Sequence, residues 1–393
     1  MLHLLLGTDW TANRDEVMKR IAADIAGRKG NRILMVPELI SHETERRLCA
    51  AGGDTASRYA EVLSFTRLAR RVADSMGSAA EECLDNGGRV VAMAAAAKNL
   101  ASRLKAYAAV ETKPEFLTGL IDAVDEFKRC CISSGDLSRA AGETEGSLAQ
   151  KLEELSLLME SYDALCSRGK RDPRDQMTWL LEQMEQGDFA KEHVFYIDGF
   201  PDFTRQHLAI LEHLIQASPD VTVSLNCDRE SSHLLAFEKA GDTASQLLRC
   251  ARRAGVEVKI ETVPGKRLPL SPLREGLFQG VISRGAASGC LDVFRAESPY
   301  LECMGAAERI RFLLAAGCRC RDITVVCTDM TVYQPLVNLV FHRLHIPVYQ
   351  SGTEDILQKS VIATVLTALD AALSGFDQKS VLRYLRSALS PVD

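Results

Sequence analysis

Short apolar strands alternate with helices at the start of this chain, and this alternation is the strongest constraint on its fold. The predicted strands are Leu2–Leu6, Arg32–Val36 and Glu61–Ser64, and the predicted helices are Asp15–Ala26, Ser41–Ala51 and Phe65–Met76. Strands that alternate with helices pair in parallel, because each crossover helix returns the chain to the same edge of the sheet. The sequence therefore predicts an α/β fold.

The α/β pattern is interrupted once and then resumes. Residues 78–189 carry apolar side chains at helical spacing with few β-branched runs, which predicts an all-helical insertion. Beyond it we expect strands at Val194–Asp198, Val221–Leu225 and Val256–Thr262 and helices at Arg205–Ala217 and Thr243–Ala254. The chain then divides into residues 1–77, the insertion 78–189, residues 190–272 that complete the first α/β unit, and residues 273–393.

A second α/β unit is predicted after a proline-rich linker at residues 264–272. Its expected strands are Leu291–Arg295, Ile323–Cys327 and Ile346–Gln350, and its expected helices are Glu302–Ala315, Tyr333–His345, Ser360–Leu373 and Gln378–Ala388. No closing element follows the last helix. We therefore expect this chain to be the N-terminal part of a longer protein.

The first strand leads into a degenerate phosphate-binding loop. Gly7 ends the strand and a helix follows, which is the layout of the P-loop G-x-x-x-x-G-K-[ST]. Counting from Gly7 places Ala12, Asn13 and Arg14 at the positions of the second Gly, the Lys and the hydroxyl residue. The side chains that bind the phosphates and Mg²⁺ in this motif are missing. The sequence therefore predicts a nucleotide-motor fold with an inactive ATPase site.

An acid at the end of the strand 194–198 is the second nucleotide-site candidate. Asp198 lies where a Walker B Asp holds Mg²⁺, but Gly199 replaces the Glu that usually positions the attacking water. The alternative is an Asp that caps the turn into the next helix. In the second unit, Thr328 and Asp329 occupy the place where an active helicase has an Arg.

A third motif joins an aromatic ring to arginines after the strand 61–64. Phe65 would stack on an unpaired base, while Arg67 and Arg70 would contact phosphates or base edges. In the alternative interpretation Phe65 is a core residue and the arginines form a solvated helix face. The spacing alone leaves both interpretations open.

Composition narrows the function classes. The net charge of −6 excludes a globally basic nucleic-acid binder. The 12 cysteines show no metal-ligand spacing, which predicts buried thiols in a reducing cytosol and no metal site. The most apolar run, Val90–Ala97, is too short to span a bilayer, and no signal peptide is recognisable. We expect a cytoplasmic protein without membrane contacts.

Several strings in the chain together resemble AddB (RexB), the B subunit of the bacterial AddAB-type ATP-dependent helicase–nuclease. They include HLLLGTDWTANRDE at the start, EVLSFTRLARRV and VFYIDGFPDFTRQ; the most specific are Ser64–Ala69 and Asp198–Gln206. The resemblance implies a superfamily 1 helicase-like, P-loop NTPase fold with two RecA-like lobes. Lobe 1A would be interrupted by a helical 1B insertion, and lobe 2A would follow.

The resemblance also implies a role in DNA double-strand-break repair and recombination. In that family this part is a degenerate helicase that holds the 3′-ended single strand and scans it for a Chi-type hotspot, beside the A subunit, which is the motor and a nuclease. The resemblance implies DNA contacts at Ser41, Phe65, Arg67, Arg70 and Phe203. The exonuclease domain and its iron–sulfur cluster lie outside this chain, so no catalytic residue, metal ligand or cofactor is assigned, and ATP with Mg²⁺ is not expected to bind.

Two other functions remain open at this point. An active DNA-dependent ATPase is supported by Gly7 and Asp198 and opposed by the missing Lys. A purely architectural half would have no DNA affinity of its own and would serve only to bind the motor subunit.

Overall fold

The computed structural model describes residues 1–53, 55–77, 83–107, 113–230, 234–266, 268–271, 273, 289–350, 356–387 and 389. It divides into a first unit, Met1–Cys290, and a second unit, Leu291–Asp393. Some positions named in the sequence predictions lie outside the described residues. They are residue 78 at the predicted boundary 77/78, residues 267 and 272 of the linker, residue 388 of the last helix and residues 390–393.

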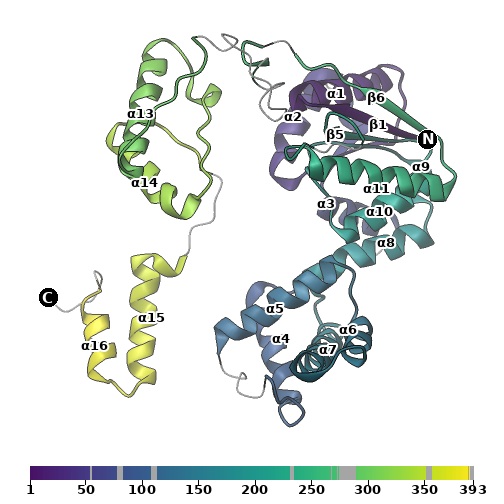
Figure 1. Ribbon diagram of the computed structural model, residues 1–393. Coiled ribbons are helices and arrows are strands. Elements are labelled where there is room, and N and C mark those ends of the chain that lie inside the picture. The colour runs from purple at the N-terminus through teal and green to yellow at the C-terminus, as the bar shows by residue number, and fades with distance from the viewer. Residues whose placement is uncertain are drawn as a thin grey trace. The chain divides into compact units, whose positions relative to one another are not determined.

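The first unit is built on a six-stranded, entirely parallel sheet with the strand order β3-β2-β4-β5-β1-β6. Its strands β1, β5 and β6 are labelled in Figure 1. Its strands are β1 (Leu2–Gly7), β2 (Arg32–Met35), β3 (Ala60–Leu63), β4 (Val194–Ile197), β5 (Val221–Asn226) and β6 (Val258–Thr262). The α/β prediction and all six predicted strands of this unit are confirmed, with ends that differ by at most two residues.

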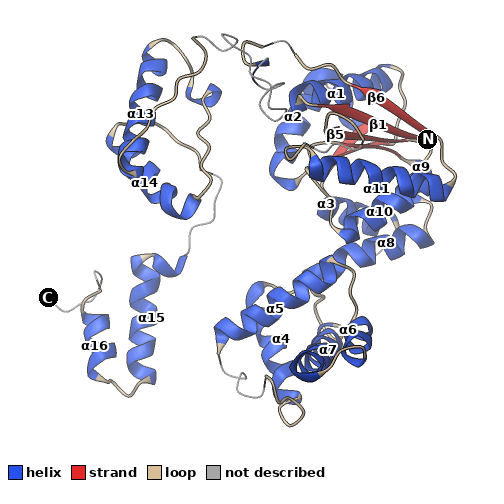
Figure 2. Ribbon diagram, viewed as in Figure 1, coloured by secondary structure: helices blue, strands red, loops and turns tan. Residues whose placement is uncertain are grey.

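Helices cover both faces of this sheet, as Figure 2 shows. One face packs against α1 (Trp10–Ala26) and α2 (Ser41–Gly52); the other packs against α3 (Phe65–Ser75), α8 (Gln176–Gln186), α9 (Phe189–Glu192), α10 (Arg205–Ala217) and α11 (Glu238–Ala254). Neighbouring residues of β1 point to opposite faces, so Leu5 packs with α1 while Leu4 lies in the other core. Because both faces of the inner strands are buried, these strands are largely apolar, whereas the edge strand β6 is partly exposed and carries Lys259 and Glu261.

Helices also make up the described part of the insertion, in agreement with the sequence pattern. They are α4 (Asn86–Asn99), α5 (Pro114–Arg129), α6 (Ser134–Gly142) and α7 (Gly146–Cys166), and they enclose their own core around Met93, Leu120 and Tyr162. A short 3-10 turn, η3 (Pro173–Asp175), returns the chain to the sheet. Helix α8 follows it, but its Leu180 and Met184 belong to the core of the sheet. By packing, the insertion therefore ends at η3.

The second unit differs from the prediction. It contains α13 (Pro299–Ala315), α14 (Met330–Arg343), α15 (Ser360–Leu373) and α16 (Gln378–Leu385), and its described residues contain no strand. The predicted strands 291–295, 323–327 and 346–350 are therefore wrong, and the described residues form one sheet rather than the sheets of two RecA-like lobes. Val326 and Tyr349 are 85% and 92% exposed. A β-branched run becomes a strand only where a neighbouring strand pairs with its backbone groups.

Shorter 3-10 turns connect the longer elements. They are η1 (Glu38–Ile40), η2 (Ala56–Arg58), η4 (Cys320–Asp322) and η5 (Ile356–Gln358). The turn η1 lies after β2 and leads directly into α2, so it contributes to the same edge of the sheet as the ends of β1 and β4.

Glu154 of α7 offers a test of the hydrogen bonds that stabilise the insertion. Its buried carboxylate accepts hydrogen bonds from the backbone N–H groups of Lys105, Ala106 and Tyr107 at 2.9, 2.9 and 3.0 Å. We expect Glu154→Leu to lower the free energy of unfolding by about 3 kcal/mol, because three donors lose a charged acceptor. Urea denaturation measures this loss. Glu154→Gln keeps an acceptor oxygen and should lose less; equal losses would contradict the assignment.

Candidate functional site

The candidate residues lie along one edge of the sheet. In open parallel sheets, ligands bind beyond the carboxyl ends of the strands. The nucleotide-site candidates follow β1 and β4, and the DNA candidates follow β2, β3 and β4. Since β3, β2 and β4 are adjacent in the sheet, the fold brings together segments that are far apart in the chain, such as those of Ser41 and Phe203, which lie 162 positions apart.

The carboxylate of Asp9 caps the N-terminus of α1. One oxygen accepts the Thr11 hydroxyl at 2.6 Å and the backbone N–H groups of Thr11 and Ala12 at 3.0 and 3.3 Å. The other accepts the backbone N–H of Lys266 at 2.9 Å. Burial opposes ionisation, but these hydrogen bonds outweigh it and hold the pKa of Asp9 below its usual range. The amides that would attract a phosphate at this helix start are therefore already bonded.

Asn13 fills the space at the end of β1. Its side-chain amide donates to the carbonyl oxygens of Gly7 and Leu225 at 3.0 and 3.1 Å. A Cβ atom on Gly7 would lie 2.2 Å from Asn13 Oδ1 and 2.9 Å from the carbonyl oxygen of Val263. Gly7 is therefore required here for the close approach of these two groups, and not for the approach of a ligand.

Arg14 pairs with Asp198 across the sheet edge. The Arg14 Nε donates to Asp198 Oδ2 at 3.3 Å, and both side chains are buried. The guanidinium carbon also lies 4.7 Å from the ring centroid of Trp10, which is half exposed. Burial raises the pKa of Asp198, against the opposing effects of the Ser224 hydroxyl and of Arg14. The pair closes the space between the ends of β1 and β4 with a positive charge of the protein itself.

Gly199 has a left-handed backbone conformation that other residues adopt only at a cost in free energy. Its φ is +81°, and an added Cβ would lie 2.9 Å from Ile40 Cδ1 and 3.4 Å from Pro37 Cδ. A glutamate at this position would need that same strained backbone and the space that Ile40 occupies. The loop after β2 therefore covers the position next to Asp198.

The DNA candidates Phe65 and Phe203 belong to one aromatic cluster, with Phe200 and His207. Phe65 stacks on His207 at a centroid distance of 4.0 Å and meets Phe200 and Phe203 edge-on at 5.4 and 6.5 Å. Phe65 is only 5% exposed, whereas Phe203 is half-buried. The cluster presents Phe203 at the surface and keeps Phe65 in the core.

The remaining DNA candidates differ in exposure. Ser41 is buried, and its hydroxyl donates to the Glu38 carbonyl oxygen at 2.9 Å. The Arg67 side chain is 37% exposed and pairs with Glu45 of α2 at 2.6 Å. Arg70 lies one helical turn further along α3 and is exposed. The side chains at the surface are therefore those of Arg67, Arg70 and Phe203.

Several residues of this edge were missed at the sequence level. Asp9 and Lys266 lie 257 positions apart, so only the fold joins them. Phe200 and Gln206 lay inside the specific string Asp198–Gln206, which is the signal that could have singled them out. Within the described ranges, no group of three or more His, Cys, Asp or Glu residues is placed to hold a metal ion. None of the helices in those ranges is both long and apolar enough to cross a bilayer.

Fold and site together define an α/β protein with helices on both faces of a parallel sheet and its polar side chains gathered at the carboxyl edge. The model of the family described as ADDB, N-terminal, matches residues 4–271. The chain therefore belongs to this family, and the resemblance drawn from its sequence strings is confirmed.

Curated relatives agree with this membership. Three relatives are each named as the B subunit of an ATP-dependent helicase/deoxyribonuclease. They come from Desulforudis audaxviator, Clostridium acetobutylicum and Clostridium perfringens and are 28%, 24% and 24% identical to this chain. The alignments cover 92%, 92% and 99% of this chain and 32%, 32% and 35% of the relatives. The chain thus spans about a third of the length of these relatives.

Two glycines with similar positive φ values allow a test of whether Ile40 closes off the position next to Asp198. Gly199 and Gly255 have φ values of +81° and +65°, but nothing lies within 4 Å of a Cβ on Gly255. We expect Gly255→Ala to cost about 1 kcal/mol from backbone strain and Gly199→Ala about 3 kcal/mol, because Ile40 must also move. Chemical denaturation of both variants measures the difference. Equal costs would mean that Ile40 yields freely.

Because His207 is partly buried in the aromatic cluster, we expect acid to lower the free energy of unfolding. Burial lowers its pKa to about 4, from an ordinary value of 6.5. Between these values the unfolded chain binds more protons than the folded chain, so the free energy of unfolding falls as the pH drops from 6.5 towards 4. We expect His207→Phe, which keeps a ring against Phe65, to lose part of this pH dependence. Denaturation curves of both proteins across this range measure it, and parallel curves would contradict the assignment.

Proposed function

We propose that the first unit is a DNA-binding module in the B subunit of a helicase–nuclease that processes broken DNA ends, and that its closed sheet edge does not hydrolyse ATP. The buried Arg14–Asp198 pair is the observation that carries the second half of this proposal. Family membership and the name that the relatives share support the first half.

Three groups of the protein occupy the positions that a nucleotide would need. Asp9 accepts the first amides of α1, Asn13 fills the end of β1, and Arg14 neutralises Asp198. A triphosphate with Mg²⁺ would have to break this buried ion pair and provide new partners for both of its charges. Nucleotide binding is thus opposed by stability as well as by the missing Lys.

DNA binding would use the surface that the aromatic cluster and α3 present. Phe203 offers a half-exposed ring for stacking on an unpaired base, while Arg67 and Arg70 offer charges for phosphates. The burial of Phe65 and Ser41 gives these two residues a positioning role. Phe65 supports Phe203, and Ser41 fixes the turn before α2, whose Glu45 holds Arg67.

The relatives are named as the B subunit of an ATP-dependent helicase/deoxyribonuclease, which supports a role for this unit in such a complex. In the proposal, the motor-nuclease A subunit supplies the ATP hydrolysis. In this proposal the module holds the 3′-ended single strand while the motor moves it, and base contacts along the edge read a hotspot of the Chi type. A strand that is held without nucleotide turnover can be sampled continuously, because no hydrolysis step releases it.

Binding of a labelled single-stranded oligonucleotide, followed by fluorescence anisotropy at several salt concentrations, tests the proposal. We expect Arg67→Ala to weaken binding and to lower the salt slope by about one, because one phosphate contact is lost. Arg139→Ala is the matched control, since Arg139 is an exposed arginine of the insertion with a neighbouring acid, Asp136. ATP with Mg²⁺ should leave the affinity unchanged.

Other outcomes would favour the rival functions. ATP-dependent binding, or DNA-stimulated ATP hydrolysis that Asp198→Ala abolishes, would replace the proposal with an active ATPase. An absence of binding at low salt would leave an architectural role, in which the unit serves only to hold the motor subunit.

A further inference from the structure

Two segments of chain form the neck between the helical insertion and the sheet. The outgoing segment precedes α4, and the returning segment precedes η3. They meet through a β-bridge between Cys83 and Arg171 and through a hydrogen bond from the Leu84 N–H to the Arg171 carbonyl oxygen at 2.8 Å. A neck of two extended segments does not by itself fix the orientation of the helices beyond it.

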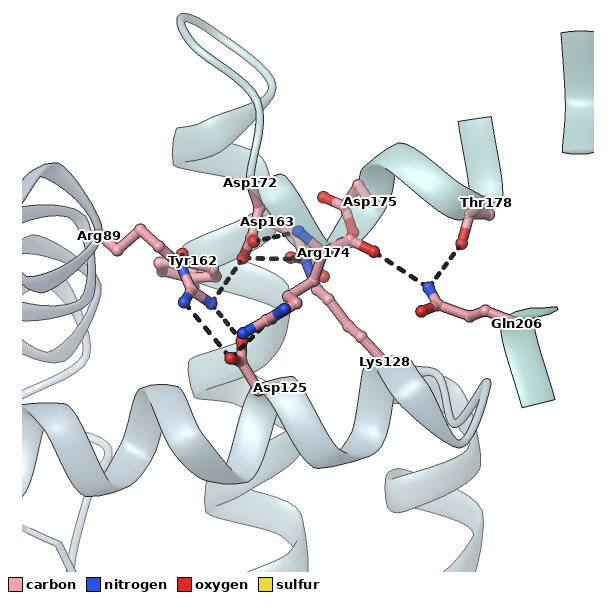
Figure 3. Close-up of polar contacts among 10 residues, drawn as sticks. All are labelled: Arg89, Asp125, Lys128, Tyr162, Asp163, Asp172, Arg174, Asp175, Thr178 and Gln206. Carbon is pink, nitrogen blue, oxygen red and sulfur yellow. Dashed lines mark hydrogen bonds and ion pairs between the residues drawn. The ribbon is translucent and has the colours of Figure 1, made fainter. Parts of the chain in front are cut away.

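Asp172 lies in this neck with no exposed surface. Its carboxylate pairs with Arg89 of α4 at 3.3 Å and Lys128 of α5 at 3.4 Å, and accepts the Arg174 backbone N–H at 2.8 Å (Figure 3). Burial favours the neutral acid, but Lys128, Arg174 and Arg89 outweigh it and hold the pKa of Asp172 below its usual range. One ionised carboxylate thus joins the returning chain to two insertion helices.

Further ion pairs tie η3 to the insertion. Asp125 of α5 pairs with Arg89 and also accepts the Arg174 Nε at 2.7 Å. Lys128 pairs with Asp163 of α7 at 2.8 Å and with Asp175 of η3 at 2.7 Å. We name this set the neck cluster; it consists of Arg89, Asp125, Lys128, Asp163, Asp172, Arg174 and Asp175 (Figure 3). The neck cluster makes η3 part of the insertion in mechanical terms.

Gln206 connects the same turn to the core. It is buried in α10, and its Nε2 donates to the Arg174 carbonyl oxygen at 3.0 Å and to the Thr178 hydroxyl at 3.2 Å (Figure 3). A cavity of about 340 Å³ lies beside it, lined by Lys128 and Asp163 from the insertion and by Met177 and Leu181 from α8. Apolar packing is therefore incomplete on this side, and the hydrogen bond from Gln206 to Arg174 spans it.

Two ion pairs, made by Arg174 and Asp175, hold η3 to the insertion, whereas one hydrogen bond, from Gln206 to the Arg174 carbonyl oxygen, holds it to α10. A buried charge cluster is seldom more stabilising than apolar packing of the same volume, but its contacts are directional. We propose that Gln206 is a latch that holds the helical insertion in one orientation on the sheet, and that the neck cluster makes the insertion move as one body when the latch opens. The pivot is the junction of η3 and α8.

Distance distributions between two spin labels test the latch. Because the chain holds 12 cysteines, the labels are attached to keto amino acids introduced at exposed positions. One pair joins Lys19 of α1 to Arg139 of α6 and spans the junction; a second pair joins Val91 of α4 to Arg139 and lies within the insertion. We expect Gln206→Met to displace or split the peak of the first pair and to leave the second pair unchanged.

Two further variants keep the test decisive. Thr178→Val removes the hydrogen bond that orients the Gln206 amide toward Arg174 and should produce a smaller displacement, which is measurable even if Gln206→Met does not fold. Gln150→Met is the matched control, since the Gln150 side chain donates to Glu154 at 3.0 Å inside the insertion, and it should change neither distribution. An unchanged first pair in both junction variants, with only a lower melting temperature, would overturn the latch and leave a stabilising contact. A change in the second pair would overturn the one-body movement.

Discussion

The buried ion pair between Arg14 and Asp198 is the contact on which the edge of the sheet depends. Two charges that are removed from water must remain together, so the start of α1 and the end of β4 are held at one separation. That separation leaves no room beside Asp198, where Ile40 covers Gly199. The loops after β1, β2 and β4 are thereby fixed relative to one another, and so are the side chains that they carry.

Much of the first unit could be predicted because its signals are local. Runs such as Leu2–Leu6 are apolar at every position except His3, as is typical of strands covered on both faces. The start of α1 was placed five residues too late, at Asp15 instead of Trp10, because its cap depends on the side chain of Asp9. The strand prediction failed at Ile323–Cys327, since pairing depends on a neighbour and not on the run itself.

The candidate site was predictable in location but not in exposure. Chain order and strand ends are enough to place Phe65 and Phe203 at one edge. Which of the two rings reaches the surface depends on His207, which stacks on Phe65 from another helix. In the same way, Ser41 looks like an available hydroxyl in the sequence, while in the fold it satisfies a carbonyl group of its own turn.

The closed loop after β1 also bears on how such a chain can change over generations. A mutation of Asn13 to Lys would remove the amide that bonds the Gly7 and Leu225 carbonyl oxygens. A mutation at Arg14 would strand the charge of Asp198, and a glutamate at Gly199 would collide with Ile40. Each of these three substitutions is harmful without the others. Single mutations can therefore alter this edge in small ways but cannot readily turn it into a nucleotide site.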